Sequence, residues 1–305
     1  MSLHATLILT LAGLALIALA VSDIFRTILH VEARGPLARA VMAALWTACR
    51  RQGRRRVLML AGPVGLLAVV SVWATLLILG WALALWPHLE DGFGREASES
   101  AGFWDALHVS VTNLTTLGLT DLVPEEAWLR VISPLEALVG FGLLSASIAY
   151  LLLIYPVLAR RRSMAYELSL LRRAEDRGGP LLEQLEEAPA ERLFAELVSR
   201  LVVIERDTAD FPAAYYFTEL DERFSFAAQS RYLLHLGRLG TGPEIPPSVR
   251  FRAQLLLDSL DAFARTSADR FPHLAAESTD EILAALAEDH LVSGRPGREA
   301  VAEST

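Results

Sequence analysis

Residues 113–121 read Asn-Leu-Thr-Thr-Leu-Gly-Leu-Thr-Asp, and this short stretch decides the fold. It follows an amphipathic run at 103–108 (Phe-Trp-Asp-Ala-Leu-His), precedes Leu-Val-Pro at 122–124, and has a long apolar segment on either side. Irregular backbone is stable at membrane depth only where protein buries it or where it lines a water-filled path. The stretch therefore predicts a re-entrant loop: a short helix enters the membrane, and an extended segment returns with its backbone carbonyls lining a path.

Three apolar segments are long enough to cross a bilayer, which takes about 20 residues. They run from about residue 3 to 29, 57 to 86 and 131 to 158. The first could instead be a cleaved signal peptide, because Ala18-Leu19-Ala20 resembles a cleavage site. However, no Lys or Arg precedes it, and its apolar run exceeds a typical signal core. We expect an all-α membrane protein with three transmembrane helices, a re-entrant pore helix with a filter loop, and a cytoplasmic helical bundle.

The arginines set the expected orientation. Residues 30–56 and 160–162 are rich in arginine, whereas the loop 88–129 is acidic and contains only Arg95. Positively charged loops favour the cytoplasmic side. We therefore expect a multi-pass protein of the plasma (inner) membrane, with the N-terminus and the acidic loop outside and the C-terminal domain in the cytoplasm.

Composition and periodicity divide the chain into three expected domains. Residues 1–56 would hold the first transmembrane helix and a basic interfacial linker helix. Residues 57–162 would hold the outer helix, pore helix, filter and inner helix. Residues 163–305 would form a cytoplasmic helical domain with a disordered tail from about Ser293.

The expected linker helix covers residues 36–50. Its apolar face, which includes Ala44 and Ala48, suits either the inner leaflet or packing on the protein itself. Asp23 and Arg26 lie three residues apart at the inner end of the first span, a spacing that favours a local ion pair.

Several functions are disfavoured by composition. A net charge of −8 gives no sign of nucleic-acid binding. A single cysteine, Cys49, excludes an intrachain disulfide and a cysteine-based metal cluster. The sequence has no glycine-rich dinucleotide fingerprint, Walker motif, Ser/His/Asp arrangement or paired carboxylates. We therefore expect neither an enzyme nor a cofactor.

Residues 57–160 resemble the pore domain of the tetrameric potassium-channel superfamily, in which an outer helix, pore helix, filter and inner helix follow one another. The filter of that family reads Thr-Val-Gly-Tyr-Gly-Asp, usually after a further Thr. Here Thr116 stands at the filter Thr and Leu117 at the Val. Gly118 matches the first Gly, and Asp121 matches the Asp. The similarity covers about a third of the chain.

The resemblance implies a homotetramer in the lipid bilayer, because one loop supplies only a quarter of a filter. Monovalent cations, potassium and also sodium, would be the permeant ions. Rings of backbone carbonyls would replace the water shell of each ion. The implied filter residues are Thr116, Leu117, Gly118, Leu119 and Thr120, of which the first four would hold the cation through their carbonyls.

Other residues are expected to support the filter. Asp105, near the start of the pore helix, can accept hydrogen bonds from free amides there, and Thr115 adjoins the filter. Three acids beyond the filter would form rings at the external mouth and attract cations, unless they lie on an ordinary solvated loop. They are Asp121, Glu125 and Glu126.

The third span contains residues with more than one interpretation. Glu136 would brace the pore helix from behind or pair with Arg130. Gly140 and Gly142 would form a gating hinge or allow close packing against the outer helix. The Tyr155-Pro156 pair would kink the helix at its cytoplasmic end.

Two residues depart from the family filter: Leu119 replaces the Tyr and Thr120 the second Gly. A β-branched residue resists the backbone conformation that glycine allows. We therefore expect reduced discrimination between potassium and sodium, or a filter that does not conduct at rest. The alternative is a non-conducting membrane sensor or scaffold whose cytoplasmic bundle binds an unknown ligand or protein. A transporter subunit is less favoured, because no inverted repeat is visible.

Overall fold

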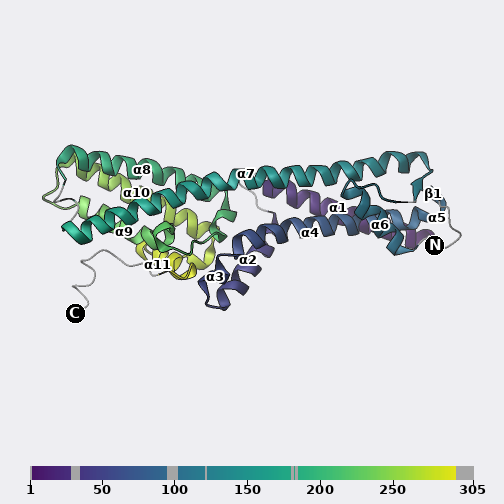
Figure 1. Ribbon diagram of the computed structural model, residues 1–305, viewed down its shortest axis with the longest axis horizontal. Coiled ribbons are helices and arrows are strands. Elements are labelled where there is room, and N and C mark those ends of the chain that lie inside the picture. Colours follow the sequence, from purple (N-terminus) through teal and green to yellow (C-terminus); the bar gives the residue numbers. More distant parts are fainter. Residues whose placement is uncertain are drawn as a thin grey trace. The chain divides into compact units, whose positions relative to one another are not determined.

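The computed structural model describes residues 2–28, 35–94, 102–120, 122–179, 182 and 185–292, and its regular structure is almost entirely helical (Figure 1). The expected all-α membrane class is confirmed. The chain divides into two compact units. The first contains residues 1–41 and 66–152, and the second contains 42–65 and 153–305.

This division differs from the domain boundaries expected after residues 56 and 162. Residues 42–65 pack with the C-terminal helices rather than with the first span. The second unit also begins ten residues earlier than the composition change suggests, because the apolar side chains of Ile154, Val157 and Leu158 are buried within it.

Three helices of the described chain are long and apolar enough to cross a membrane. They are α1 (Leu3–Ile28), the helical stretch Arg55–Gly92 that contains α4 (Ala61–Leu85), and α7 (Ala127–Gly178). Helix α7 runs without interruption through Tyr155-Pro156, so this pair does not end the helix.

Helices α1 and α4 cross at two glycines. A methyl group on Gly13 would lie 2.4 Å from the carbonyl oxygen of Gly80, and one on Gly80 would lie 2.9 Å from the carbonyl oxygen of Gly13. Small residues of this kind let two helix backbones touch, which is how helices pack in a membrane without a hydrophobic driving force between them.

Asp23, at the inner end of α1, caps another helix. Its buried carboxylate accepts hydrogen bonds from the amides of Leu37 (2.9 Å) and Ala38 (3.1 Å), which open α2 (Pro36–Arg51), and from the indole of Trp73 (2.8 Å). The local pair expected with Arg26 is wrong. Three donors from other segments satisfy this carboxylate, and two of them are amides that a helix start leaves without partners.

One face of α2 packs on the protein. Its buried stripe is Ala38, Met42 and Trp46, at four-residue spacing, whereas Ala44 and Ala48 of the expected apolar face are exposed. In the second unit the Trp46 indole donates to Asp289 (2.8 Å). These contacts correspond to packing on the protein, one of the two expected environments.

The segment between α4 and α7 in the first unit is built from short elements. In order they are η1 (Trp86–His88), α5 (Leu89–Gly92), β1 (Phe93–Gly94), α6 (Phe103–Leu114) and β2 (Val123–Pro124). The two strands are antiparallel, with Phe93 opposite Pro124 and Gly94 opposite Val123. They lie over a buried cluster of Ala82, Leu85, Leu89, Phe93, Ala106, Val109, Leu122 and Leu129.

The second unit is a helical bundle, as its periodicity predicts. Besides parts of α2, α4 and α7, it contains α3 (Arg55–Leu58), α8 (Glu187–Asp210), η3 (Pro212–Tyr216), η4 (Glu222–Phe224), α9 (Phe226–Gly240), α10 (Pro247–Arg270), η5 (Pro272–Leu274) and α11 (Thr279–Asp289). Helices α8 and α10 lie side by side (Figure 1). The expected tail from Ser293 lies outside the described residues.

Candidate functional site

Helix α6 is a short helix that carries the decisive stretch at its C-terminal end. It begins after Gly102, and the carboxylate of Asp105 accepts a hydrogen bond from the Gly102 amide at 2.8 Å. One amide at the helix start thus has the partner that the sequence predicted for it. The buried face of α6 includes Ala106 and Val109, which fix the helix against the apolar cluster.

The backbone after α6 turns back toward the end of the helix. The amides of Leu117 and Gly118 both donate to the carbonyl oxygen of Thr112, at 2.9 and 3.2 Å. This oxygen is one of the carbonyls that a helix C-terminus leaves without a partner. The N–H groups of two consecutive residues therefore face the helix, and the side chains from Thr115 to Leu119 are exposed.

The sign of φ alternates along this segment. Thr116 (+60°) and Gly118 (+62°) lie in the left-handed region, whereas Thr115 has φ of −81° and Leu117 is not in that region. Alternating handedness aligns successive N–H groups on one side of the chain, which leaves the carbonyls on the other. Thr120 avoids positive φ, as its β-branch favours, but Thr116 adopts it at a cost of about 1–3 kcal/mol.

The carbonyls of the segment fall into two groups. Those of Thr116 and Leu117 accept no hydrogen bond from the described part of the chain. By contrast, the Gly118 carbonyl accepts from the Thr120 amide (3.1 Å), and the Leu119 carbonyl accepts from the His108 ring (2.9 Å). The Thr116 and Leu117 carbonyls are therefore available to a ligand, whereas the Gly118 and Leu119 carbonyls already have partners.

Glu136 of α7 lies directly behind α6 and is completely buried. Its carboxylate oxygens are 2.5 Å from the Ser110 hydroxyl and 3.2 Å from the Asn113 amide nitrogen. Arg130 instead donates to the carbonyl of Pro124 (3.2 Å). The sequence left two contacts open for Glu136, one with the short helix and one with Arg130. The structure has the contact with the short helix.

Gly140, one turn further along α7, touches the end of α6. A methyl group there would lie 1.8 Å from the carbonyl oxygen of Leu114. The sequence suggested packing against the outer helix, but the close contact is with α6. Nothing lies within 4 Å of the corresponding position on Gly142.

The acidic residues beyond the segment are only partly described. Glu125 and Glu126 are exposed, and their amides donate to the carbonyl of Gly92 at 2.9 and 3.3 Å. Asp121 lies outside the described residues. Within the described ranges, no cluster of three or more His, Cys, Asp or Glu side chains could hold a metal ion. A cation at this site would therefore rely on backbone oxygens.

Known proteins resemble this part of the chain. Residues 65–155 match a family model described as an ion channel. This match supports the predicted resemblance of this part of the chain to the pore domain of the potassium-channel superfamily. The chain is also 28% identical, over 158 residues, to the uncharacterized membrane protein YdjJ of Bacillus subtilis (strain 168). That match covers 51% of this chain and 46% of the relative. No solved structure matches the chain.

Sequence reasoning missed the partners that hold residues 115–120. Ser110 and His108 lie on α6, and the Thr112 carbonyl accepts hydrogen bonds from the amides of Leu117 and Gly118. One signal was present in the sequence: Ser110 and Asn113 place two polar side chains three residues apart on a helix that also has inward apolar residues, so they need a polar partner.

Proposed function

We propose that four copies of this chain assemble around a common axis into a homotetrameric cation channel of the plasma membrane. The N-terminus would lie outside, and the C-terminal unit would lie in the cytoplasm. The supporting observation is the pair of hydrogen bonds from Leu117 and Gly118 to Thr112, which turns amides toward the pore helix and leaves the Thr116 and Leu117 carbonyls available. Rings of such carbonyls can replace the water shell of a cation.

The proposed conduction path uses backbone oxygens and negative potential alone. Residues 116–120 form its filter, with Thr115 at the inner end. The C-terminal end of α6, at Thr112, carries partial negative charge that favours a cation beside it. Glu125 and Glu126, joined by Asp121, would raise the local cation concentration at the external mouth. Monovalent cations are the permeant ions, and no cofactor or catalytic group is required.

Potassium selectivity is proposed to be weak. The Gly118 and Leu119 carbonyls are engaged by the Thr120 amide and the His108 ring, so fewer carbonyl rings remain for an ion. The number of coordinating carbonyl dipoles is one of the properties that distinguish potassium from sodium. Leu119 also lacks the hydroxyl with which a tyrosine could brace the filter.

Single-channel recording of the purified protein in planar bilayers tests this proposal. We expect cation currents whose reversal potential under potassium/sodium gradients shifts little from zero. A large shift toward the potassium equilibrium potential would contradict the weak-selectivity proposal while leaving the channel proposal intact. Silence under all voltages applied would contradict the channel itself.

A second candidate function, a non-conducting membrane sensor or scaffold, is favoured by the same outer hydrogen bonds. The contacts Thr120 to Gly118 and His108 to Leu119 close the outer half of the filter within a single chain. If they persist in the assembly, the Gly118 and Leu119 carbonyls are engaged within each chain rather than offered to an ion. Currents that appear only in His108→Ala would indicate that the resting filter is closed by this contact.

A further inference from the structure

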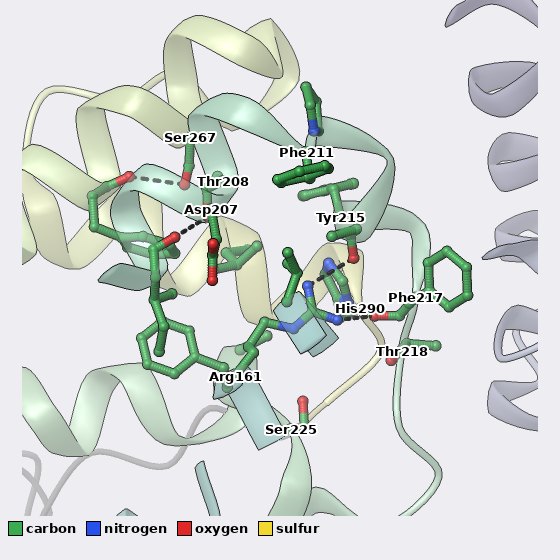
Figure 2. A pocket seen from close by; sticks show the side chains of 18 of the residues that line it. Arg161, Asp207, Thr208, Phe211, Tyr215, Phe217, Thr218, Ser225, Ser267 and His290 are labelled. Atoms are coloured by element: carbon green, nitrogen blue, oxygen red, sulfur yellow. Dashed lines mark hydrogen bonds between the residues drawn. The ribbon is translucent and has the colours of Figure 1, made fainter. Parts of the chain in front are cut away.

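A small cavity, lined mostly by apolar side chains with a few polar and charged groups among them, lies within the second unit. Its volume is about 40 Å³, and it is enclosed by α7, α8, the segment from η3 to the start of α9, α10 and the end of α11. Figure 2 shows Arg161, Thr218, Ser225 and His290 around it. A cavity of this size holds one small ion or a water molecule or two.

Arg161 lines this cavity, and its partners differ from those of its two neighbours in the sequence, Arg160 and Arg162. Arg160 makes two hydrogen bonds with Asp207 (2.8 and 2.7 Å), and Arg162 makes one with Glu219 (2.5 Å). Arg161, between them, donates only to the backbone carbonyls of residues 214 and 217, so most of its five N–H groups make no bond to the described chain. No carboxylate of the described residues lies within ion-pair distance of it.

The missing counter-charge is significant because a positive charge removed from water is stable only when it is paired or well hydrogen-bonded. Asp207 and Glu219 also line the cavity, but each is already neutralised by its own arginine. Among the charged residues described at the cavity, Arg161 is the one without an ion-pair partner, although the Glu219 carboxylate acts on it through space.

Two buried polar side chains at the cavity also have polar atoms without a hydrogen bond. Neither the Thr218 hydroxyl nor the Nε2 atom of His290 makes a hydrogen bond to the described residues, although the two residues are only 5% and 4% exposed. Burial, followed by the positive charge of Arg161, lowers the pKa of His290 from 6.5 to about 3. The ring is therefore neutral at physiological pH, and its one N–H can lie on the nitrogen that faces the cavity.

Helix α9 begins at the same cavity. Ser225, Phe226 and Ala227 line it, and the Ser225 side chain makes no capping hydrogen bond. The amides of Phe226 and Ala227 make no backbone hydrogen bond to the described chain. Such a helix start carries partial positive charge and donors that favour an anion.

We propose that this cavity, enclosed by Arg161, Thr218, His290 and the start of α9, binds a single monovalent anion of chloride size. The guanidinium supplies the charge, and the hydroxyl, imidazole and helix amides supply donors. Sulfate, which is larger and carries two charges, is not the expected occupant. The site lies at residues that continue directly from the inner helix, and its occupancy does not depend on whether the pore conducts.

Thermal unfolding of the full-length protein in detergent tests the site. Melting temperature is measured at constant ionic strength while sodium gluconate is replaced by sodium chloride, bromide or sulfate. We expect chloride and bromide to raise it saturably, and sulfate to have the same effect as gluconate. Equal curves in chloride and gluconate would overturn the proposal and leave water as the occupant, and equal stabilisation by sulfate would overturn it too.

Two threonines provide matched variants. Thr218 and Thr208 both line the cavity, but the Thr208 hydroxyl already donates to the carbonyl of Ile204 (2.8 Å). Thr218→Val should raise the half-saturating chloride concentration by about tenfold or more, because it removes a hydrogen bond to a charged group. Thr208→Val should leave it nearly unchanged. Equal shifts in both variants would contradict the assigned geometry.

Discussion

The Ser110 hydroxyl lies 2.5 Å from the carboxylate of Glu136, and this contact fastens the short pore helix to the inner helix. The same hydroxyl lies 3.0 Å from the carbonyl of Ile78 on the outer helix. One small side chain thus touches both long helices of the pore domain. Glu136 and Ser110 are both completely buried, so water cannot replace either of them as a hydrogen-bond partner of the other.

Removing this carboxylate should destabilise the pore domain. Glu136→Ala removes an acceptor of the Asn113 amide and one of the two acceptors beside the Ser110 hydroxyl, and it leaves a void at a completely buried position, at a cost of about 2–4 kcal/mol. Glu136→Gln keeps an acceptor and should cost less than half as much. Thermal unfolding followed by size-exclusion chromatography measures the effect, with the exposed Glu125→Ala as control. Equal losses in the two Glu136 variants would show that the hydrogen bonds are not the cause.

Two glycines of the inner helix should respond differently to a methyl group. Gly140→Ala places its methyl 1.8 Å from the Leu114 carbonyl and must displace the end of the pore helix, with a destabilisation of about 2–3 kcal/mol or more. Gly142→Ala meets open space and should be neutral, or stabilising by up to about 1 kcal/mol. Melting temperatures compare the two. If Gly142→Ala instead destabilises the protein as much as Gly140→Ala does, Gly142 contacts another copy of the chain.

Restoring the family residues should sharpen selectivity. Leu119→Tyr combined with Thr120→Gly returns the backbone freedom and the bracing hydroxyl that this filter lacks. We expect the permeability ratio of potassium to sodium to rise by about tenfold or more, which corresponds to roughly 1.4 kcal/mol. Bi-ionic reversal potentials measure the ratio. As a control, Glu126→Gln at the proposed external mouth should alter the conductance without altering the permeability ratio. An unchanged permeability ratio in the double variant would contradict the assignment of the filter.

The second unit should lose stability in mild acid through His290. Burial lowers the pKa of this ring from 6.5 to about 3, with Arg161, Arg55 and His273 acting in the same direction and Asp289 opposing them. The unfolded chain therefore binds one more proton than the folded chain between these two values. The stability is fully present above pH 6.5 and decreases as pH falls toward 3, by at most about 1.4 kcal/mol per pH unit.

Unfolding of the full-length protein between pH 7 and 4.5 measures this slope. The carboxyls of Asp221 and Asp261, whose pKa values are lowered by Arg223 and Thr279 respectively, add to the loss mainly at lower pH. His290→Gln should flatten the slope, whereas His235→Gln should not change it. An unchanged slope in His290→Gln would mean that another group titrates in this range.

Much of the pore domain could be predicted from local pattern. The apolar segments, the short helix and the filter stretch are each encoded by contiguous residues, so period and composition are enough to find them. Asp105 was predictable for the same reason, since a helix start and its capping carboxylate lie within one turn. The alternative contacts of Glu136 and Gly140 could be named but not decided, because their partners lie on other segments.

What could not be predicted depends on packing between distant residues. Asp23 finds its donors on α2 and at Trp73, which no local spacing indicates. The buried face of α2 is set by Trp46 reaching Asp289 near the end of the bundle, rather than by the alanines that hydrophobicity favours. The positive φ of Thr116 also defies its own propensity, because the hydrogen bonds to Thr112 determine the backbone there.

The most direct test of the central claim is a cryo-electron-microscopy map of the purified protein in potassium-containing buffer. The account predicts four copies around one axis, with ion density on that axis beside the carbonyls of Thr116 and Leu117. A map in which the 113–120 segments point away from any shared axis, or in which the copies enclose no central conduit, would contradict it.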